Sequence, residues 1–287
     1  MAGRAAHLEA VGQPSANSLP LYTSGMDQER LARISKLAER LHALTDSQLH
    51  WVEEIVQQFS TRSKFILNES NLFDDCMIRS FGDALLVQHC FSKQPMTKDR
   101  FEYVLEAVSN ICGHTAALAG RGLRGPDITI EGETYSLKTQ AERSIREDEI
   151  HISKFMELGK GKWGTDPSDL VGLRDQFLEH LKFYDRILCL RALSTPPSDW
   201  RYELVEIPKS LLAQASGGAL EMMIESPQLP RPGYCHVKDD KGAIKFQLYF
   251  DGGSERKLQV RHLRKSLCRV HATWQFPAPA LDSQPDV

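Results

Sequence analysis

The stretch "GPDITIEGETYSLKTQ", Gly125 to Gln140, predicts two short strands with a turn between them. In "ITIE" and "TYSLKT", β-branched and aromatic residues alternate with polar ones, and this period of two is typical of strands. The intervening "EGE" predicts the turn of an antiparallel hairpin. Asp127 comes directly after a proline at the start of the first strand, and Lys138 lies near the end of the second. If the strands pair as a hairpin, the carboxylate and the ammonium meet at one edge.

The residues before this hairpin predict helices. Apolar residues recur at helical spacing in "DQERLARISKLAERLHAL" and again in "TDSQLHWVEEIVQQFS". Two further helices are predicted, one across Phe73 to Phe91 and one in "TKDRFEYVLEAVSNICG", where Thr97 can cap the start and Gly113 can end it. Glu102 lies just off the apolar stripe of the last helix.

The residues after the hairpin predict a mixed arrangement. A polar helix is expected from about Gln140 to Leu158, and another in "PSDLVGLRDQFLEHLKFY". Strands are expected in "DRILCLRALS" and "WRYELVEIP", and then in "YCHVKD", "AIKFQLYFD", "KLQVRHL" and "CRVHATWQF". The predicted fold class is therefore α/β (α+β), with a mixed central sheet flanked by helices, a helical N-terminal region and a β-rich C-terminal region.

Composition limits the function classes. The chain has 35 Lys and Arg against 38 Asp and Glu, a net charge of -3, so any nucleic-acid contact must be a local basic patch. No apolar run reaches the ~20 residues of a membrane span, and the N-terminus lacks a secretory signal, so we expect a cytoplasmic protein without a membrane partner. The six cysteines are scattered singly, which predicts reduced thiols. A zinc site combining Cys235 and His236 with Cys268 and His271 is the weaker alternative.

Asp127 and Lys138 suggest a specific chemistry. Carboxylate oxygens suit Mg²⁺, and a neighbouring lysine can orient or deprotonate a water that attacks a phosphodiester, or offset the charge of the pentavalent state. The simpler alternative is that Asp127 only starts a strand and that Lys138 is a solvated strand end.

The order of elements around this pair resembles the core of the PD-(D/E)XK nucleases. A helix with Glu102, a strand preceded by "PD", a strand with "SLK", a helix and the strand "RILCLRAL" follow one another from about Thr97 to Ala192. The resemblance implies a restriction-endonuclease-like core, Mg²⁺ as cofactor and no nucleotide cofactor. Among these nucleases the chain looks most like a type II restriction endonuclease, a homodimer that cuts double-stranded DNA at a specific sequence.

One position departs from that family. The acid expected two residues before the lysine is Ser136, which cannot supply a negative charge. Some relatives with a Ser-x-Lys strand recruit a glutamate from the following helix, and here the first choice is Glu142 and the runner-up Glu149. Gln140 is a further candidate beside the metal. The resemblance thus implies metal binding by Asp127 and Glu142, and a catalytic set of Asp127, Lys138, Glu142, Glu102 and Ser136.

The resemblance to the nuclease core, together with the composition of the two ends, also predicts the domain limits. We expect a flexible arm at 1–24, a helical region at 25–96, the PD-(D/E)XK-like catalytic core at 97–195, a β-rich C-terminal part of the same domain at 196–276 with a candidate DNA contact, and a disordered tail at 277–287.

Two basic segments are candidates for DNA contacts. The helix predicted after Lys138 could enter the major groove, and "SERKLQVRHLRKSLCRVHATW" carries a local excess of positive charge. The alternatives are ordinary ion pairs along that helix and a solvated face of an edge strand. The candidate DNA-binding residues are Arg143, Arg146, Ser153, Lys154, Lys257, Arg261 and Arg264.

The leading hypothesis is thus an Mg²⁺-dependent type II site-specific deoxyribonuclease. A structure-specific DNA repair nuclease on the same core is the second enzyme hypothesis. A DNA-binding protein that kept the core and lost its chemistry is the third, and Ser136 is the residue that favours it.

Overall fold

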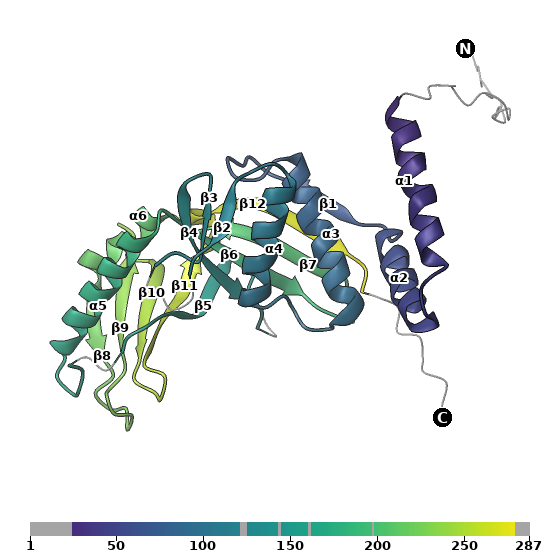
Figure 1. Ribbon diagram of the computed structural model, residues 1–287. Helices are drawn as coiled ribbons and strands as arrows, with labels where there is room; N and C mark the ends of the chain where they lie inside the picture. The colour runs from purple at the N-terminus through teal and green to yellow at the C-terminus, as the bar shows by residue number, and fades with distance from the viewer. Residues whose placement is uncertain (1–24, 121–124, 143–144, 160–161, 197, 279–287) are drawn as a thin grey trace, which may run out of the picture. The chain divides into compact units, whose positions relative to one another are not determined.

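The computed structural model describes residues 25–120, 125–142, 145–159, 162–196 and 198–278 (Figure 1). The chain divides into two compact units, Met1–Glu53 and Glu54–Val287. The first contains α1 (Gly25–Leu41) and the start of α2 (Asp46–Phe59), which confirms both predicted helices. None of the helices in the described ranges is long and apolar enough to cross a membrane. The expected arm at 1–24 and most of the expected tail lie outside these ranges.

A mixed sheet forms the centre of the second unit, as predicted. Its strand order is β1-β12-β7-β6-β4-β3-β2 within the described residues, and only β4 and β6 pair in parallel. The strands are β1 (Lys64–Leu67), β2 (Ala116–Leu118), β3 (Ile128–Ile130), β4 (Glu133–Gln140), β6 (Arg186–Ser194), β7 (Trp200–Glu206) and β12 (Arg269–Phe276). β1 lies inside the region expected to be helical. It was not predicted, because four residues are too few to show the alternation of a strand.

The predicted hairpin is present in β3 and β4. Ile128 pairs with Tyr135 and Ile130 with Glu133 in antiparallel register. The two turn residues, Glu131 and Gly132, have φ of 50° and 83°, as a tight hairpin turn requires. Asp127 therefore lies at the entrance to the hairpin, beside the middle of β4.

Helices α3 (Asp75–Phe91) and α4 (Lys98–Ile111) lie together over one face of this sheet (Figure 1). Phe81 of α3 packs against Trp274 and Phe101, with ring centroids 4.9 and 5.9 Å apart. Thr97 caps α4 by accepting a hydrogen bond from the Arg100 N–H, as its sequence predicts. After α4, Gly113 takes a φ of 88°, the left-handed conformation that glycine adopts without strain.

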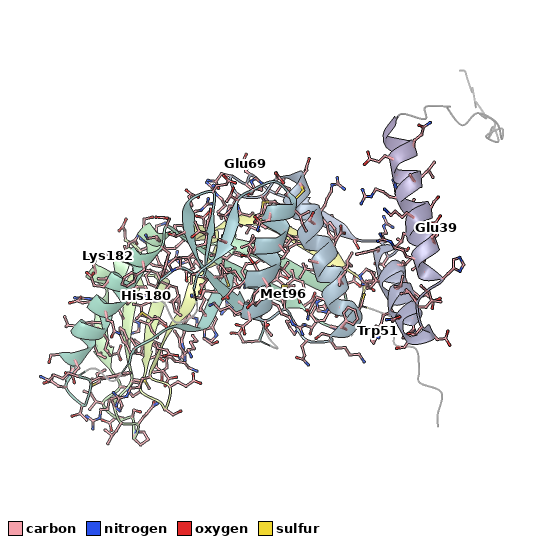
Figure 2. The ribbon with its side chains drawn as sticks, in the orientation of Figure 1. Glu39, Trp51, Glu69, Met96, His180 and Lys182 are labelled. Carbon is pink, nitrogen blue, oxygen red and sulfur yellow. A yellow bond between two sulfur atoms is a disulfide. The ribbon has the colours of Figure 1, made fainter. Side chains whose placement is uncertain are left out.

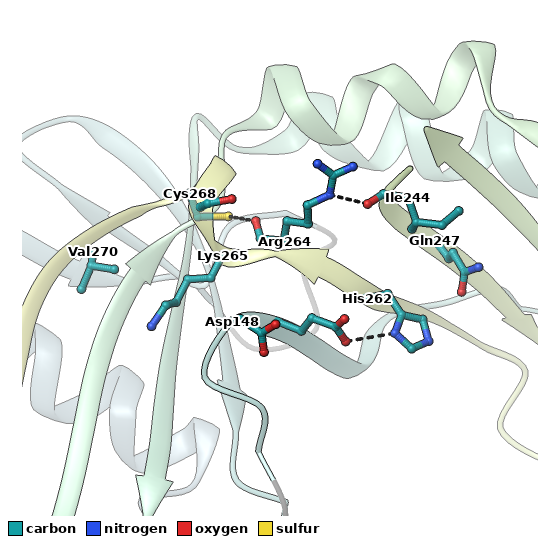
Figure 3. A pocket seen from close by; sticks show the side chains of 10 residues that line it. Asp148, Ile244, Gln247, His262, Arg264, Lys265, Cys268 and Val270 are labelled. Atoms are coloured by element: carbon teal, nitrogen blue, oxygen red, sulfur yellow. Dashed lines mark hydrogen bonds and ion pairs between the residues drawn. The ribbon is translucent and has the colours of Figure 1, made fainter. Parts of the chain in front are cut away.

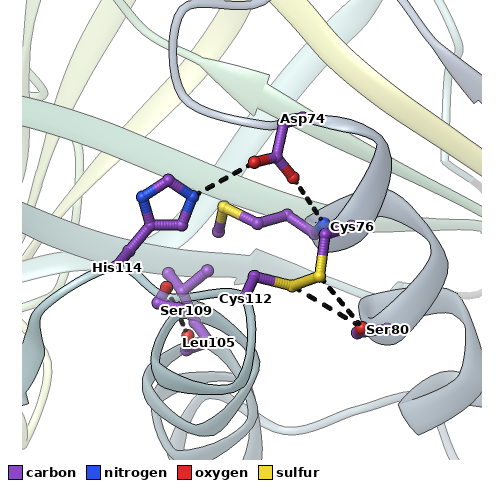
Figure 4. Close-up of a disulfide and its surroundings, with 8 residues drawn as sticks. Asp74, Cys76, Ser80, Leu105, Ser109, Cys112 and His114 are labelled. Carbon is purple, nitrogen blue, oxygen red and sulfur yellow. Dashed lines mark hydrogen bonds and ion pairs between the residues drawn. A yellow bond between two sulfur atoms is a disulfide. The ribbon is translucent and has the colours of Figure 1, made fainter.

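The expectation of six reduced thiols is wrong for one pair. Cys76 at the start of α3 and Cys112 at the end of α4 form a disulfide (Figure 4). Their Cα atoms are 5.7 Å apart although 36 positions separate them in sequence, because the two helices pack side by side. Single cysteines in separate helices give no sign of such a pairing. The other four cysteines, all in described residues, are free.

A second sheet is antiparallel throughout, with the order β5-β11-β10-β9-β8 in the described residues. Its strands are β5 (Glu149–Glu157), β8 (Ala219–Met222), β9 (Gly233–Lys238), β10 (Ile244–Asp251) and β11 (Lys257–Arg264). Helix α5 (Asp169–His180) lies over one face of it (Figure 1), and the two share a buried core. The remaining short elements are α6 (Lys209–Leu212) and the 3₁₀ turns Leu181–Phe183, Ala213–Gly217 and Lys265–Leu267.

The polar helix expected from Gln140 to Leu158 is wrong. β4 continues to Gln140, a loop follows, and β5 then pairs with β11. Ile150, Ile152 and Phe155 of β5 enter the core, while the polar residues between them face outward. The dense charges of "AERSIREDEIHISKF" concealed this alternation, and the pairing partner lies about a hundred residues away. Of the residues assigned to that helix, Glu142 and Arg146 precede β5, whereas Glu149, Ser153 and Lys154 belong to β5.

Candidate active site

Asp127 connects the entrance of the hairpin to β4. Its Oδ2 accepts hydrogen bonds from the Leu137 N–H at 2.6 Å and from the Ser136 hydroxyl at 3.3 Å. The same oxygen lies 4.0 Å from the Lys138 Nζ, so the hairpin brings the predicted pair together. The carboxylate is about one-fifth exposed and can reach solvent.

The other oxygen of Asp127 shares a cation with a helix. Lys98, in the first turn of α4, places its Nζ 2.7 Å from Asp127 Oδ1 and 2.7 Å from Glu102 Oε1. A lysine is unfavourable at a helix N-terminus because the helix dipole is positive there, so the two carboxylates must hold it. Burial opposes the charge, but these two hydrogen bonds raise the pKa of Lys98. Two carboxylate oxygens thus converge on one point, already occupied by a positive charge.

The start of α4 is fixed by buried polar contacts. Met96, which precedes the helix (Figure 2), donates its N–H to the Tyr202 hydroxyl at 3.1 Å. The same hydroxyl lies 2.9 Å from His89 Nε2. Tyr202 belongs to β7, so the central sheet positions the helix turn that carries Lys98 and Glu102.

Lys138 is a buried lysine on the face of β4 that points toward β5. Its residue is only 6% exposed, and its Nζ donates to Ser136 Oγ at 2.6 Å and to the Leu137 carbonyl at 3.3 Å. The ammonium also lies 5.2 Å from the centre of the Phe155 ring. Burial lowers the pKa of Lys138 to about 8, although the charge of Asp127 opposes this change. A lysine with such a pKa can lose its proton near neutral pH.

Gln140, the last residue of β4, belongs to a buried network. Its Oε1 accepts a hydrogen bond from Arg191 Nε at 2.8 Å. Arg191, fully buried on β6, pairs with Glu203 and donates to the carbonyls of Arg146 and Glu149 at 2.7 and 2.6 Å. Arg191 therefore connects the end of β4, at Gln140, with Arg146 and Glu149, which follow it in the chain.

The two candidate recruited acids have other partners. Glu142 forms an ion pair with His151 Nδ1 at 3.1 Å, and Glu149 pairs with Arg146 and His262 at 3.2 and 3.0 Å. Burial opposes ionisation of Glu142, but the hydrogen bond from His151 lowers its pKa.

Lys98, Arg191 and Tyr184 are site residues that the sequence did not reveal. The Tyr184 hydroxyl is buried and has no hydrogen-bond partner among the described residues. Burial and the nearby charge of Asp127 raise its pKa. Lys98 could have been noticed by its spacing of four residues from Glu102, but nothing in the sequence links either residue to Asp127.

The residues predicted to contact DNA differ in their exposure and in their partners within the chain. Arg143 is outside the described residues. Lys154 and Lys257 form surface ion pairs with Glu157 and Glu255, and Ser153 is exposed on β5. Arg264 is held by Asp239 at 2.7 Å and by the carbonyls of Ile244 and Ala243. The zinc alternative is not supported by the side-chain contacts, because His271 lies between Ser70 and Glu206 whereas His236 contacts Glu221 and Gln247.

Two cavities share lining residues, and the smaller of them includes Gln140 of β4. One of about 310 Å³ is lined by Gln140, Glu142, Arg146, Glu149, Ile150, His151, Arg261 and His262. A larger one of about 880 Å³ shares Glu149 and His262 with it and extends to Arg264 and Lys265 (Figure 3). Charged and imidazole side chains line both cavities.

Comparisons with known proteins identify the family of the chain. The sequence profile of the SmaI family, described as type II site-specific deoxyribonuclease, matches residues 37–276. The type II restriction enzyme SmaI of Serratia marcescens is 42% identical to the chain over 235 residues, which cover 82% of this chain and 92% of that enzyme. No solved structure matches the chain.

Proposed function

The chain belongs to the SmaI family of type II site-specific deoxyribonucleases, and we propose that Asp127, Glu102 and Lys138 form its cutting centre. It is a type II restriction endonuclease, a hydrolase that binds and cuts double-stranded DNA, and enzymes of this type use a divalent metal ion. A restriction enzyme acts where the DNA is, so we expect it in the cytoplasm. The arrangement supports a PD-(D/E)XK core in which a helix supplies an acid near the hairpin.

Asp127 and Glu102 are the residues that would hold the metal, and Mg²⁺ suits their oxygen donors. The observation that supports this assignment is the Lys98 ammonium, which lies 2.7 Å from one oxygen of each carboxylate. A position that accepts one cation between two carboxylates fits another, provided that Lys98 swings away. When bound, the metal would supply an activated water and would stabilise the negative charge that develops on the phosphate.

Lys138 is the residue that would orient or deprotonate the attacking water. Ser136 accepts a hydrogen bond from its ammonium and donates one to Asp127, so the serine connects the two charged groups. This contact gives Ser136 a positioning role in place of the charge that the family expects at its position.

Recruitment of Glu142 remains a prediction, and we favour Glu102 as the second acid. About 13 Å of strand separate Ser136 from Gln140, and Glu142 lies beyond that end. Glu102 needs no recruitment, because it already shares a cation with Asp127. The carboxylate of Glu149 lies farther along the chain and is held by Arg146 and His262.

Matched variants test the assignment. In a calorimetric titration with Mg²⁺, Asp127→Asn and Glu102→Gln should each weaken binding at least tenfold, whereas Glu142→Gln should bind as the unmodified chain does. Cleavage of a plasmid should fall in parallel. Normal metal binding by Glu102→Gln together with lost binding by Glu142→Gln would overturn our choice and restore the recruited acid. Specific DNA binding without cleavage by the unmodified chain would instead support an inactive protein.

A homodimer is the assembly that we propose on DNA. Restriction sites are commonly palindromic, and a twofold protein matches a twofold duplex. Sedimentation of the chain with and without a cognate duplex would show the mass of two copies, and a single copy on the duplex would contradict the proposal.

A further inference from the structure

The outward face of the second sheet carries an ordered group of polar and aromatic side chains. Along β9, β10 and β11, apolar residues alternate into the core around α5, while the residues between them face outward. Gln247 lies opposite Arg261, and Tyr249 lies opposite both Gln259 and Tyr234. We call these five side chains the reading face. Only Arg261 among them carries a full charge.

Arg261 is held in one orientation before any ligand binds. Its guanidinium lies 3.8 Å from the centre of the Tyr249 ring, within the range of a cation–π contact. Its Nε donates to Gln259 Oε1 at 2.9 Å, and its Nη1 donates to the Tyr234 hydroxyl at 3.3 Å. A side chain ordered in advance loses less conformational entropy on binding.

The charge and most donors of Arg261 remain available. No carboxylate in the described part of the chain forms an ion pair with it, in contrast to Arg264 and Arg146. Arginine has five N–H donors, and Gln259 and Tyr234 take two of them, which leaves three. A guanine edge needs two parallel donors, one each for O6 and N7.

The neighbours of Arg261 favour a base over a phosphate. The amide nitrogen of Gln247 lies 2.9 Å from His236 Nδ1, and its carbonyl oxygen is an acceptor, which a base edge can use and a phosphate, a pure acceptor, cannot. Gln259 is buried and holds Arg261 in place, because its Nε2 donates to Asp251 at 3.1 Å while its Oε1 accepts from Arg261. Tyr234 and Tyr249 restrict the guanidinium to one plane.

One cavity is lined both by the reading face and by β4, the strand that carries Lys138. The lining of the cavity of about 310 Å³ includes both Gln140, which follows Lys138 by two residues, and Arg261. His151 of β5 spans the two regions, because its ring contacts Glu142 at 3.1 Å and Gln259 at 3.5 Å. DNA whose phosphate lies at Lys138 can therefore present its neighbouring base pairs to Arg261.

We propose that Arg261 reads a guanine of the recognition site through O6 and N7 in the major groove, and that Tyr249 positions it. The inference rests on the proposed function only for the location of the cut, since it concerns how the sequence is selected. Tyr249 acts through Arg261 and does not itself touch the base in this arrangement.

Binding measured without cleavage tests the proposal. A digest of DNA of known sequence by the unmodified chain first identifies the site. Fluorescence anisotropy in Ca²⁺ then compares a duplex with that site, a scrambled duplex, and duplexes in which one guanine at a time is 7-deazaguanine, which lacks N7. Arg261→Ala should weaken binding to the cognate duplex by roughly 5- to 150-fold while leaving the scrambled duplex nearly unchanged. Replacing one guanine by 7-deazaguanine should lower the affinity of the unmodified chain for the duplex, but it should not lower the affinity of Arg261→Ala.

Two further variants separate reading from charge and folding. Lys257→Ala removes one positive charge from the same strand and should weaken both duplexes by a similar factor. Tyr249→Leu should reduce discrimination between the duplexes while circular dichroism stays unchanged. Equal losses on both duplexes for Arg261→Ala, or an undiminished 7-deazaguanine effect in that variant, would overturn the proposal. The two proposals fail separately. Cleavage by Lys138→Met would contradict the cutting centre, whereas the binding results for Arg261→Ala test only the reading of guanine.

Discussion

Replacing Lys138 with methionine should change how the stability of the protein depends on pH. The pKa of this lysine is about 8 in the folded chain, against 10.5 for an ordinary lysine. Above about pH 10.5 both folded and unfolded chains hold it neutral, and below about pH 8 both hold it charged. Between these values mainly the unfolded chain binds the proton, so the folded state loses stability as the pH falls through this window.

The size of the effect follows from the same two values. Between about pH 9.5 and about pH 7, linkage predicts that Lys138 costs the folded chain about 2 kcal/mol. Methionine has a similar length and no titrating group, so this loss should be missing in Lys138→Met. The variant also loses hydrogen bonds to Ser136 and Leu137, but these shift its stability by a similar amount at every pH in this range.

Urea unfolding with a chelator present, at several pH values, measures the difference. Plotted against pH, the free energy of unfolding of Lys138→Met minus that of the unmodified chain should rise by about 2 kcal/mol from pH 9.5 to pH 7. Lys154→Met is the matched control, because Lys154 is exposed and its pKa is raised by Glu157, and it should give a flat difference. A flat difference for Lys138→Met as well would refute the reasoning.

Three other changes have defined outcomes. Lys98→Met should bind Mg²⁺ about fivefold more tightly in a calorimetric titration, because the ammonium no longer competes for the two carboxylates. The fivefold change corresponds to an ion-pair free energy of about 1 kcal/mol. Weaker binding would show that Lys98 helps to hold the ligand. Arg191→Met should lower the free energy of unfolding by about 3–5 kcal/mol, and the double variant with Glu203→Leu should recover part of it; equal losses in both would contradict a buried pair. Serine at both Cys76 and Cys112 should lower the free energy of unfolding in oxidising buffer by about 2–4 kcal/mol, and a reductant should abolish that difference.

The hairpin and its two charged residues could be predicted from the sequence because the information is local. Period-two alternation, a glycine turn and the positions of Asp127 and Lys138 determine which side chains meet, and the structure places the two groups 4.0 Å apart. The helices α3 and α4 were equally predictable from their apolar spacing and caps.

The strand β5 could not be predicted in the same way. Its residues are held by pairing with β11, and Glu157 pairs with Lys257, a hundred positions later. Local helix preference of a charged segment was overridden by this distant partner. The same applies to the reading face, whose members come from three strands and meet only in the folded sheet.

The proposed second acid, Glu102, shows most clearly what one sequence does not reveal. The order of the elements makes Glu102 a candidate, but the missing charge at Ser136 favours Glu142 as the metal ligand on sequence grounds. The packing of α4 against the hairpin, fixed through Met96 and Tyr202, is what brings Glu102 to Asp127. A tertiary contact of this kind has no signature in one sequence.

The central claim is that Lys138 acts in the cutting step and not in binding DNA. The most direct measurement is a digest of a plasmid of known sequence with Mg²⁺ by the unmodified chain and by Lys138→Met, together with their affinities for the same duplex in Ca²⁺. We predict discrete fragments from the unmodified chain, none from the variant, and affinities within a few-fold of each other. Discrete fragments from Lys138→Met at a comparable rate would contradict the account.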